Sequence, residues 1–151
     1  MIDSVGRRRT PGFAQDRIRE ARVAKGWTQG RLAAEADVSL RTITAWERGL
    51  RAPEPPTLVM LARVLDIEPH ELLVIPADQW TLIELRTATG LLQQSAAKAV
   101  SVTPDRLSHL ESGYERLDDR TRAALAAVYH VSDEMVQDSW QRGRDQLRAR
   151  D

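Results

Sequence analysis

Few residues in this 151-residue chain have the types and spacing that catalysis or metal binding requires. The chain has no cysteine, which excludes a disulfide, a thiolate zinc site and a cysteine nucleophile. The three histidines, His70, His109 and His130, lie far apart and lack the spacing that places two metal ligands on one helix face. The sequence has no glycine-rich phosphate loop and no serine in a nucleophile motif. We therefore expect neither an enzyme nor a cofactor or metal site.

Arginine is the residue type of this chain that could carry a binding function, because its guanidinium group binds phosphates and base edges. Of the 22 basic residues, only Lys25 and Lys98 are lysine. Residues 1–76 contain twelve basic and ten acidic residues, a net charge of +2. Residues 77–140 contain six basic and ten acidic residues, a net charge of −4, and residues 141–151 contain four and two. A surface that binds a polyanion is therefore expected in the first half of the chain.

The composition restricts the fold class. Hydrophobic residues make up 42% and charged residues 29%, which is typical of a globular protein. No window approaches eighteen uninterrupted apolar residues, so no transmembrane helix is expected. Residues 7–9 are basic but are followed by Thr10 and Pro11 rather than an apolar core, so the N-terminus does not resemble a secretory signal. Aromatic residues make up only 5%, and the fifteen glycines and prolines are too few for the turns of an all-β sandwich, so we expect a helical protein. The absence of cysteine favours a reducing, cytoplasmic location.

An internal repeat organises the chain. The identical pairs are separated by 64 positions without a gap, and most other core positions stay apolar. The sequence therefore predicts two copies of one unit of about 55 residues, joined near Pro76. The residues that recur 64 positions later are Glu20, Arg22, Ala24, Gly26, Gln29, Ala33, Val38, Glu47, Gly49, Thr57, Leu61, Ala62 and Val64.

Each copy is expected to form five short helices. In the first copy Gly26 ends the opening helix, Thr28 and Ser39 cap the next two, and a proline-rich turn precedes the fourth. The second copy repeats this plan, with Thr103 as a cap and Pro104 at the first helical position. After the opening helix, the expected helices of the first copy span residues 29–36, 40–48, 57–65 and 69–73.

The segment Gln29–Trp46 has the spacing of a helix-turn-helix. Ala33 is small where the two helices cross, Val38 lies inside the turn, and Ile43 faces the core. The string TQGRLAAEADVSLRTITAWERG resembles the Cro/phage-repressor (XRE-like) family of DNA-binding domains, and the resemblance extends through Leu73. The second copy resembles the same family more faintly over residues 79–137. The turn departs from the family pattern, because Asp37 and Ser101 replace the usual glycine.

The resemblance implies an all-α fold of two tandem five-helix, lambda-repressor-like helix-turn-helix domains. It divides the chain into a basic arm over residues 1–15, a first domain over 16–75, and a second over 77–151 with an extended C-terminal helix. It also implies a sequence-specific transcriptional regulator, a repressor, whose helix 40–48 lies in the major groove of double-stranded DNA. The residues expected to contact DNA are Gln29, Ser39, Leu40, Arg41, Thr42, Thr44, Ala45, Arg48 and Arg51, with Arg7, Arg8 and Arg9 in the arm.

The second copy has lost the basic surface, since Asp105 stands at the position of Arg41 and Ser112 at that of Arg48. Two interpretations remain open: a fold kept for packing and partner contact, or a second DNA-binding surface with altered specificity. An antitoxin-like module that binds a protein partner through this acidic domain is the alternative function. We also expect a cytoplasmic, nucleoid-associated homodimer. Its interface is expected to include the helical stripe Val136, Trp140 and Leu147, although the first copy is the alternative surface that could cover this stripe.

Overall fold

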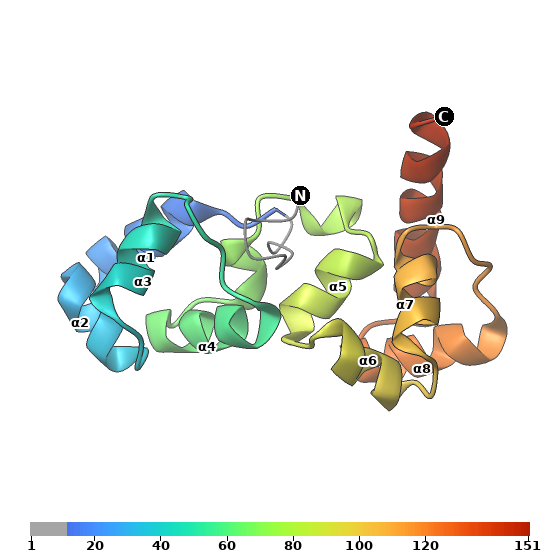
Figure 1. The fold of residues 1–151 in the computed structure, drawn as a ribbon, viewed down its shortest axis with the longest axis horizontal. Coiled ribbons are helices and arrows are strands. Elements are labelled where there is room, and N and C mark those ends of the chain that lie inside the picture. Colours follow the sequence, from blue (N-terminus) through green and yellow to red (C-terminus); the bar gives the residue numbers. More distant parts are fainter. Residues whose placement is uncertain (1–11) are drawn as a thin grey trace. The chain divides into compact units, whose positions relative to one another are not determined.

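The computed structural model describes residues 12–151, which divide into two compact units, residues 12–75 (unit 1) and residues 76–151 (unit 2) (Figure 1). Apart from one isolated bridge between Phe13 and Leu73, the described residues form helices and turns. No helix within residues 12–151 is long and apolar enough to cross a bilayer. The expected all-α fold is confirmed.

Unit 1 contains four α-helices and one 3-10 helix around an apolar core. The caps follow the sequence prediction, since the backbone N–H groups of Arg31 and Thr42 donate to the hydroxyls of Thr28 and Ser39, both at 3.1 Å. The elements are α1 (Gln15–Ala24), α2 (Gln29–Glu35), α3 (Leu40–Glu47), α4 (Pro55–Leu65) and η1 (Pro69–Leu72). Their fully buried side chains are Ile18, Leu32, Ile43, Leu58, Leu61 and Leu72.

Two boundaries in unit 1 differ from the sequence expectations. Helix α4 begins at Pro55 rather than Thr57, because a proline in the first helical turn has its φ preset and needs no N–H partner. The expected arm over residues 1–15 extends too far, since the N–H of Ala14 donates to the Leu72 carbonyl at 2.9 Å and α1 starts at Gln15. Residues 12–15 therefore belong to the folded unit. Arg7, Arg8 and Arg9 lie outside the described residues.

Unit 2 repeats this arrangement and ends in a longer helix. Pro104 occupies the first position of α7, and the Thr103 hydroxyl accepts from the N–H of Arg106 at 3.1 Å, as the sequence predicted. Helix α9 begins after Ser132, as expected, and continues for 17 residues where η1 of unit 1 has four. The elements are η2 (Ala77–Gln79), α5 (Leu82–Thr89), α6 (Gln93–Ala99), α7 (Pro104–Glu111), α8 (Asp119–Tyr129) and α9 (Asp133–Ala149).

The residues that replace glycine in the two turns adopt the left-handed conformation, with φ of +53° at Asp37 and +58° at Ser101. For a non-glycine residue this conformation costs about 1–2 kcal/mol, and aspartate tolerates it better than serine. The turn geometry of the fold is therefore kept at an energetic cost, which is larger in unit 2.

Ser101→Gly is expected to stabilise unit 2 by roughly 0.5–1 kcal/mol, because relief of the backbone strain exceeds the extra entropy of a glycine in the unfolded chain. Amide hydrogen exchange of unit 2 in the full chain measures this change. The control is Ser95→Gly, an exposed position inside α6, where glycine should lower stability by about 0.5 kcal/mol. Equal effects of the two substitutions would contradict the prediction.

Candidate nucleic-acid interface

The first turn of α3 points into solvent, whereas the opposite face of the helix is fixed in the core. Ile43 is fully buried and Trp46 is 6% exposed, so the helix cannot rotate without opening unit 1. Leu40 is 53% exposed, and Ser39, Arg41 and Arg48 are also exposed. Thr42, Thr44 and Ala45 are half-buried along the edge of the same face. The structure thus presents the side chains of the first helical turn on a rigid support.

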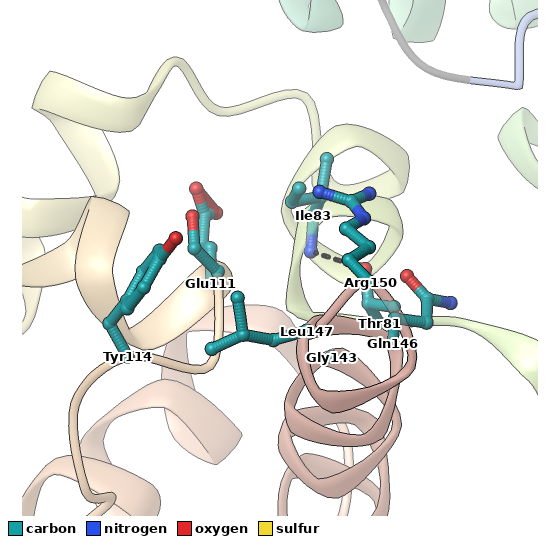
Figure 2. Close-up of a pocket in the computed structure, with 9 residues that line it drawn as sticks. Thr81, Ile83, Glu111, Tyr114, Gly143, Gln146, Leu147 and Arg150 are labelled. Atoms are coloured by element: carbon teal, nitrogen blue, oxygen red, sulfur yellow. Dashed lines mark hydrogen bonds between the residues drawn. The ribbon is translucent and has the colours of Figure 1, made fainter.

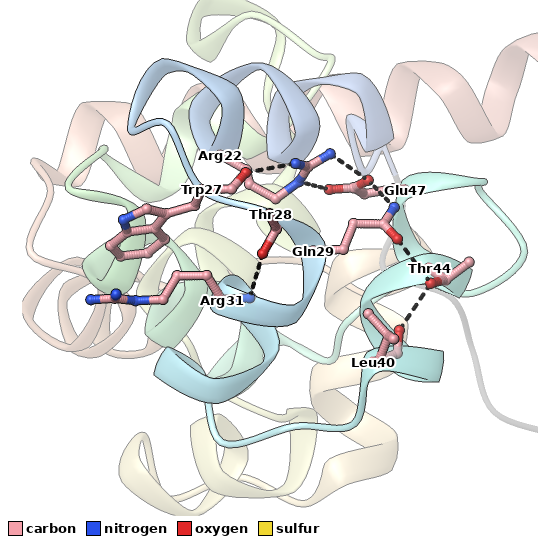
Figure 3. Close-up of polar contacts among 8 residues, drawn as sticks. All are labelled: Arg22, Trp27, Thr28, Gln29, Arg31, Leu40, Thr44 and Glu47. Atoms are coloured by element: carbon pink, nitrogen blue, oxygen red, sulfur yellow. Dashed lines mark hydrogen bonds and ion pairs between the residues drawn. The ribbon is translucent and has the colours of Figure 1, made fainter.

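A buried polar network joins α1, α2 and α3 (Figure 3). Arg22 forms a bidentate ion pair with Glu47, from Nε to Oε1 at 2.6 Å and from Nη2 to Oε2 at 3.2 Å. A third donor, Nη1 of Arg22, binds the Trp27 carbonyl at 2.8 Å. Burial alone would raise the pKa of Glu47, but the hydrogen bonds from Arg22 and Gln29 outweigh it and hold this pKa below its ordinary value.

Gln29 connects this network to the exposed face of α3. Its amide nitrogen donates to Glu47 at 2.6 Å, and its amide oxygen accepts from the Thr44 hydroxyl at 3.3 Å. The Thr44 hydroxyl also lies 3.0 Å from the Leu40 carbonyl (Figure 3). An amide nitrogen carries two hydrogens, so one N–H of Gln29 is left for another acceptor. The side chain that the family resemblance assigns to a phosphate is therefore held in place by the fold.

Unit 2 contains the same network at an offset of 64 residues. Arg86 binds Glu111 from Nε at 2.7 Å and from Nη2 at 3.3 Å, and its Nη1 donates to the Leu91 carbonyl at 3.1 Å. Gln93 donates to Glu111 at 2.7 Å. Sequence reasoning identified these repeated residues but did not identify them as partners. One signal in the sequence could have indicated the ion pair. An arginine and a glutamate both recur at the offset of 64, whereas most of the other identical positions are apolar or turn residues.

Three exposed arginines on α3, at its C-cap or within three residues after it lack a carboxylate partner among residues 12–151. They are Arg41 on the first turn of α3, Arg48 at its C-cap, and Arg51 after it. Lys25 lies 2.6 Å from Asp66 and Arg31 lies 2.9 Å from Glu35, so these two cations are paired. Arg19 on α1 and Arg63 on α4 are exposed and form no ion pair with the described residues. The unpaired guanidinium groups remain available to an external anion.

The equivalent surface of unit 2 has a different charge pattern. Asp105 is exposed at the position that Arg41 occupies in unit 1. The neighbouring Arg106 is bound by two carboxylates, Glu115 at 2.8 Å and Asp118 at 2.5 Å, which raise the pKa of Arg106. The Thr121 backbone N–H and the Arg106 guanidinium together lower the pKa of Asp118 to about 2. The positive charge of Arg106 is therefore neutralised within unit 2 itself.

Comparison with protein families agrees with this geometry. Residues 18–72 match the family model described as "Helix-turn-helix", and residues 80–138 match the one described as "Helix-turn-helix domain". Both units are helix-turn-helix domains. The expected tandem arrangement and the resemblance of the first copy to the Cro/phage-repressor type are confirmed. Neither matched model is an enzyme family. No curated protein and no solved structure matches the chain.

The stripe on α9 of this tandem helix-turn-helix protein differs from the sequence expectation. Val136 is fully buried and Trp140 is 8% exposed, so unit 2 itself covers both side chains without a second chain. The Trp140 indole N–H donates to the Glu115 carbonyl at 3.1 Å. Of the expected interface, only Leu147 keeps a partly exposed side chain. The sequence suggested a partner helix because α9 extends past the repeat, but α5, α7 and α8 of the same unit cover its inner face.

Proposed function

We propose that this tandem helix-turn-helix protein is a sequence-specific transcriptional regulator, a repressor, whose α3 lies in the major groove of double-stranded DNA. The observation that carries the proposal is the contrast between the units. Arg41 on the first turn of α3 has no carboxylate partner among the described residues, whereas the first turn of α7 has Asp105 at the equivalent position and Arg106 bound by two carboxylates. Arg41 on the exposed first turn of a rigid helix, with Arg48 and Arg51 at and after the C-terminal end of that helix, supports binding to a polyanion.

Each exposed side chain of α3 has a chemical role in this proposal. The planar fork of Arg41 suits the O6 and N7 atoms of guanine, and Leu40 or Thr42 suits a thymine methyl group. Ser39, Thr44 and Ala45 lie at adjacent base edges or phosphates. Gln29 offers its remaining N–H to a phosphate. Arg48 and Arg51 bind the backbone on either side of the groove, as the basic arm of Arg7, Arg8 and Arg9 is proposed to do.

Arg41→Ala is expected to weaken specific DNA binding by roughly 1–3 kcal/mol and to relax the preference at one base pair, because it removes a bidentate base contact. Selection of bound sites from random duplex DNA supplies the operator, and fluorescence anisotropy then measures affinity. The matched control is Arg63→Ala, an exposed arginine on α4. Asp105→Ala should leave affinity unchanged or raise it slightly. An equal loss in the Arg41 and Arg63 variants would contradict the proposal.

A protein-interaction role for unit 2, of the antitoxin-like kind, is the second candidate. It is supported by Asp105 on the exposed first turn of α7 and by the neutralisation of Arg106. Both features disfavour a phosphate backbone and are compatible with a protein partner. In the full chain, an Asp105→Arg substitution that leaves DNA affinity unchanged would support this candidate, whereas a large gain in affinity would indicate that α7 already lies against DNA.

We further propose that the protein binds DNA as a homodimer, because a head-to-tail repeat has no two-fold axis and two chains supply one. Two recognition helices of such a dimer would lie about 34 Å apart on one face of the duplex. Sedimentation of the full chain at tens of micromolar should show dimers, and a species that is only monomeric would refute the proposal. Trp140→Glu does not test dimerisation, since this buried indole stabilises unit 2 itself.

A further inference from the structure

A pocket of about 150 Å³ lies in unit 2, where the start of α5, the end of α7 and the last turns of α9 meet (Figure 2). In Figure 2 the side chains of Tyr114, Glu111 and Leu147 surround the opening between α7 and α9, and the side chain of Arg150 extends from the end of α9. A cavity of about this volume, lined by apolar side chains, accommodates a ring the size of benzene. The pocket therefore has room for a small molecule.

The pocket depends on features that unit 2 does not share with unit 1. Helix α9 continues for 17 residues at the point where unit 1 has only the four residues of η1. It crosses the end of α7 at close range, because a Cβ atom on Gly113 would lie 2.6 Å from the Arg144 Cα atom. The last turns of α9 thereby form a wall that the helix-turn-helix core does not need.

The walls combine apolar side chains with polar ones, among them Thr81, Ser112 and a neutralised carboxylate. Ile83, Leu147 and the ring of Tyr114 provide the apolar part, and Tyr114 is 71% exposed, which is unusual for a large aromatic side chain. The Glu111 carboxylate also lines the pocket, but both of its oxygens accept hydrogen bonds from Arg86 or Gln93. The charge of Glu111 is balanced within its own network and does not exclude an anion.

The rim carries an unpaired cation. Arg150 is exposed and has no carboxylate partner among residues 12–151, and the side-chain amide of the neighbouring Gln146 forms no hydrogen bond with the described residues. A guanidinium fork binds a carboxylate with two parallel hydrogen bonds. Ligand pockets commonly pair apolar walls with one such polar group, which fixes the orientation of the ligand.

We propose that this pocket binds a small, flat aromatic carboxylate of about the size of benzoate. The ring would lie against Tyr114 and Leu147, and the carboxylate would pair with Arg150. The pocket is confined to unit 2, so this inference does not depend on the DNA-binding role of unit 1.

Benzoate is the probe, titrated into the ¹⁵N-labelled full chain and followed by NMR. Saturable shifts are expected at the pocket residues, with a dissociation constant on the order of 1 mM, in keeping with a ligand of this size. Benzamide has the same shape without the charge and should bind at least roughly tenfold more weakly. Absence of saturable shifts at pocket residues with benzoate, or equal binding of benzamide, would overturn the proposal.

A pair of charge-matched variants identifies the cation. Arg150→Gln is expected to weaken benzoate binding roughly tenfold or more, because it removes the bidentate donor. Arg148→Gln removes the same charge from an exposed position on α9 that does not line the pocket, and it should leave binding within about twofold. If both variants lost benzoate affinity equally, the loss would reflect the net charge of α9 rather than a contact with Arg150, and the proposed site would be refuted.

Discussion

Glu47→Ala is expected to lower the free energy of unfolding of unit 1 by about 3–5 kcal/mol, the typical cost of removing one partner of a buried ion pair. The side chains of Arg22 and Glu47 are only 12% and 5% exposed, so the remaining guanidinium cannot regain full hydration. Gln29 loses its acceptor in the same substitution, and the contact between α2 and the end of α3 weakens. The exposed face of α3 would then lose its rigid support.

Hydrogen exchange of the core amides of α4, measured in the full chain, reports the stability of unit 1 separately from unit 2. Glu35→Ala is the control, because its ion pair with Arg31 is exposed and contributes at most about 0.5 kcal/mol. Glu111→Ala provides a second comparison, since it breaks the equivalent pair and should lower the stability of unit 2 alone. A loss below about 1 kcal/mol for Glu47→Ala would show that water reaches the site.

The network that contains Glu47 also makes the stability of unit 1 depend on pH. The pKa of Glu47 is lowered in the folded state, so the unfolded chain binds its proton at a higher pH. The stabilisation from Glu47 is therefore complete above the unfolded pKa, near 4.5, and is lost as the pH falls through the lower, folded value. The Glu47→Ala variant should lack this part of the acid dependence of unit 1.

Gly113→Ala is expected to destabilise unit 2 by about 3 kcal/mol or more. The first contribution is the backbone, because φ is +80° at Gly113 and a left-handed alanine costs about 1–2 kcal/mol. The second is steric: the new Cβ would lie 2.6 Å from the Cα and 2.9 Å from the amide nitrogen of Arg144. These are backbone atoms of α9, so relief requires movement of the helix, which carries the buried Val136 and Trp140.

Gly26→Ala separates these two contributions. Gly26 has a similar φ of +71°, but an added Cβ would meet no atom within 4 Å. Its substitution should therefore cost unit 1 only the backbone part, about 1–2 kcal/mol. Hydrogen exchange of each unit compares the two variants. If Gly113→Ala cost no more than Gly26→Ala, the close crossing of α7 and α9 would not be a constraint on unit 2.

The sequence by itself determined the fold class, the repeat and most helix boundaries, because these depend on local signals. Capping hydroxyls such as Thr28, Ser39 and Thr103 bind backbone groups within three residues, and apolar periodicity marks the buried face of each helix. The left-handed turn at Asp37 and Ser101 followed from the family pattern. The exposed first turn of α3 followed from the same pattern, since Ile43 and Trp46 fix which face is buried.

Only the tertiary structure decided which residues pair across the sequence. Arg22 and Glu47 are 25 residues apart, and nothing local distinguishes their ion pair from two solvated surface charges. The same holds for α9, because its apolar stripe could pack against a second chain as well as against α5, α7 and α8 of its own unit. In the structure it packs within unit 2, where Gly113 and Gly143 allow α9 to approach the end of α7 closely. Periodicity specifies that a face is buried, whereas its partner depends on the path of the whole chain.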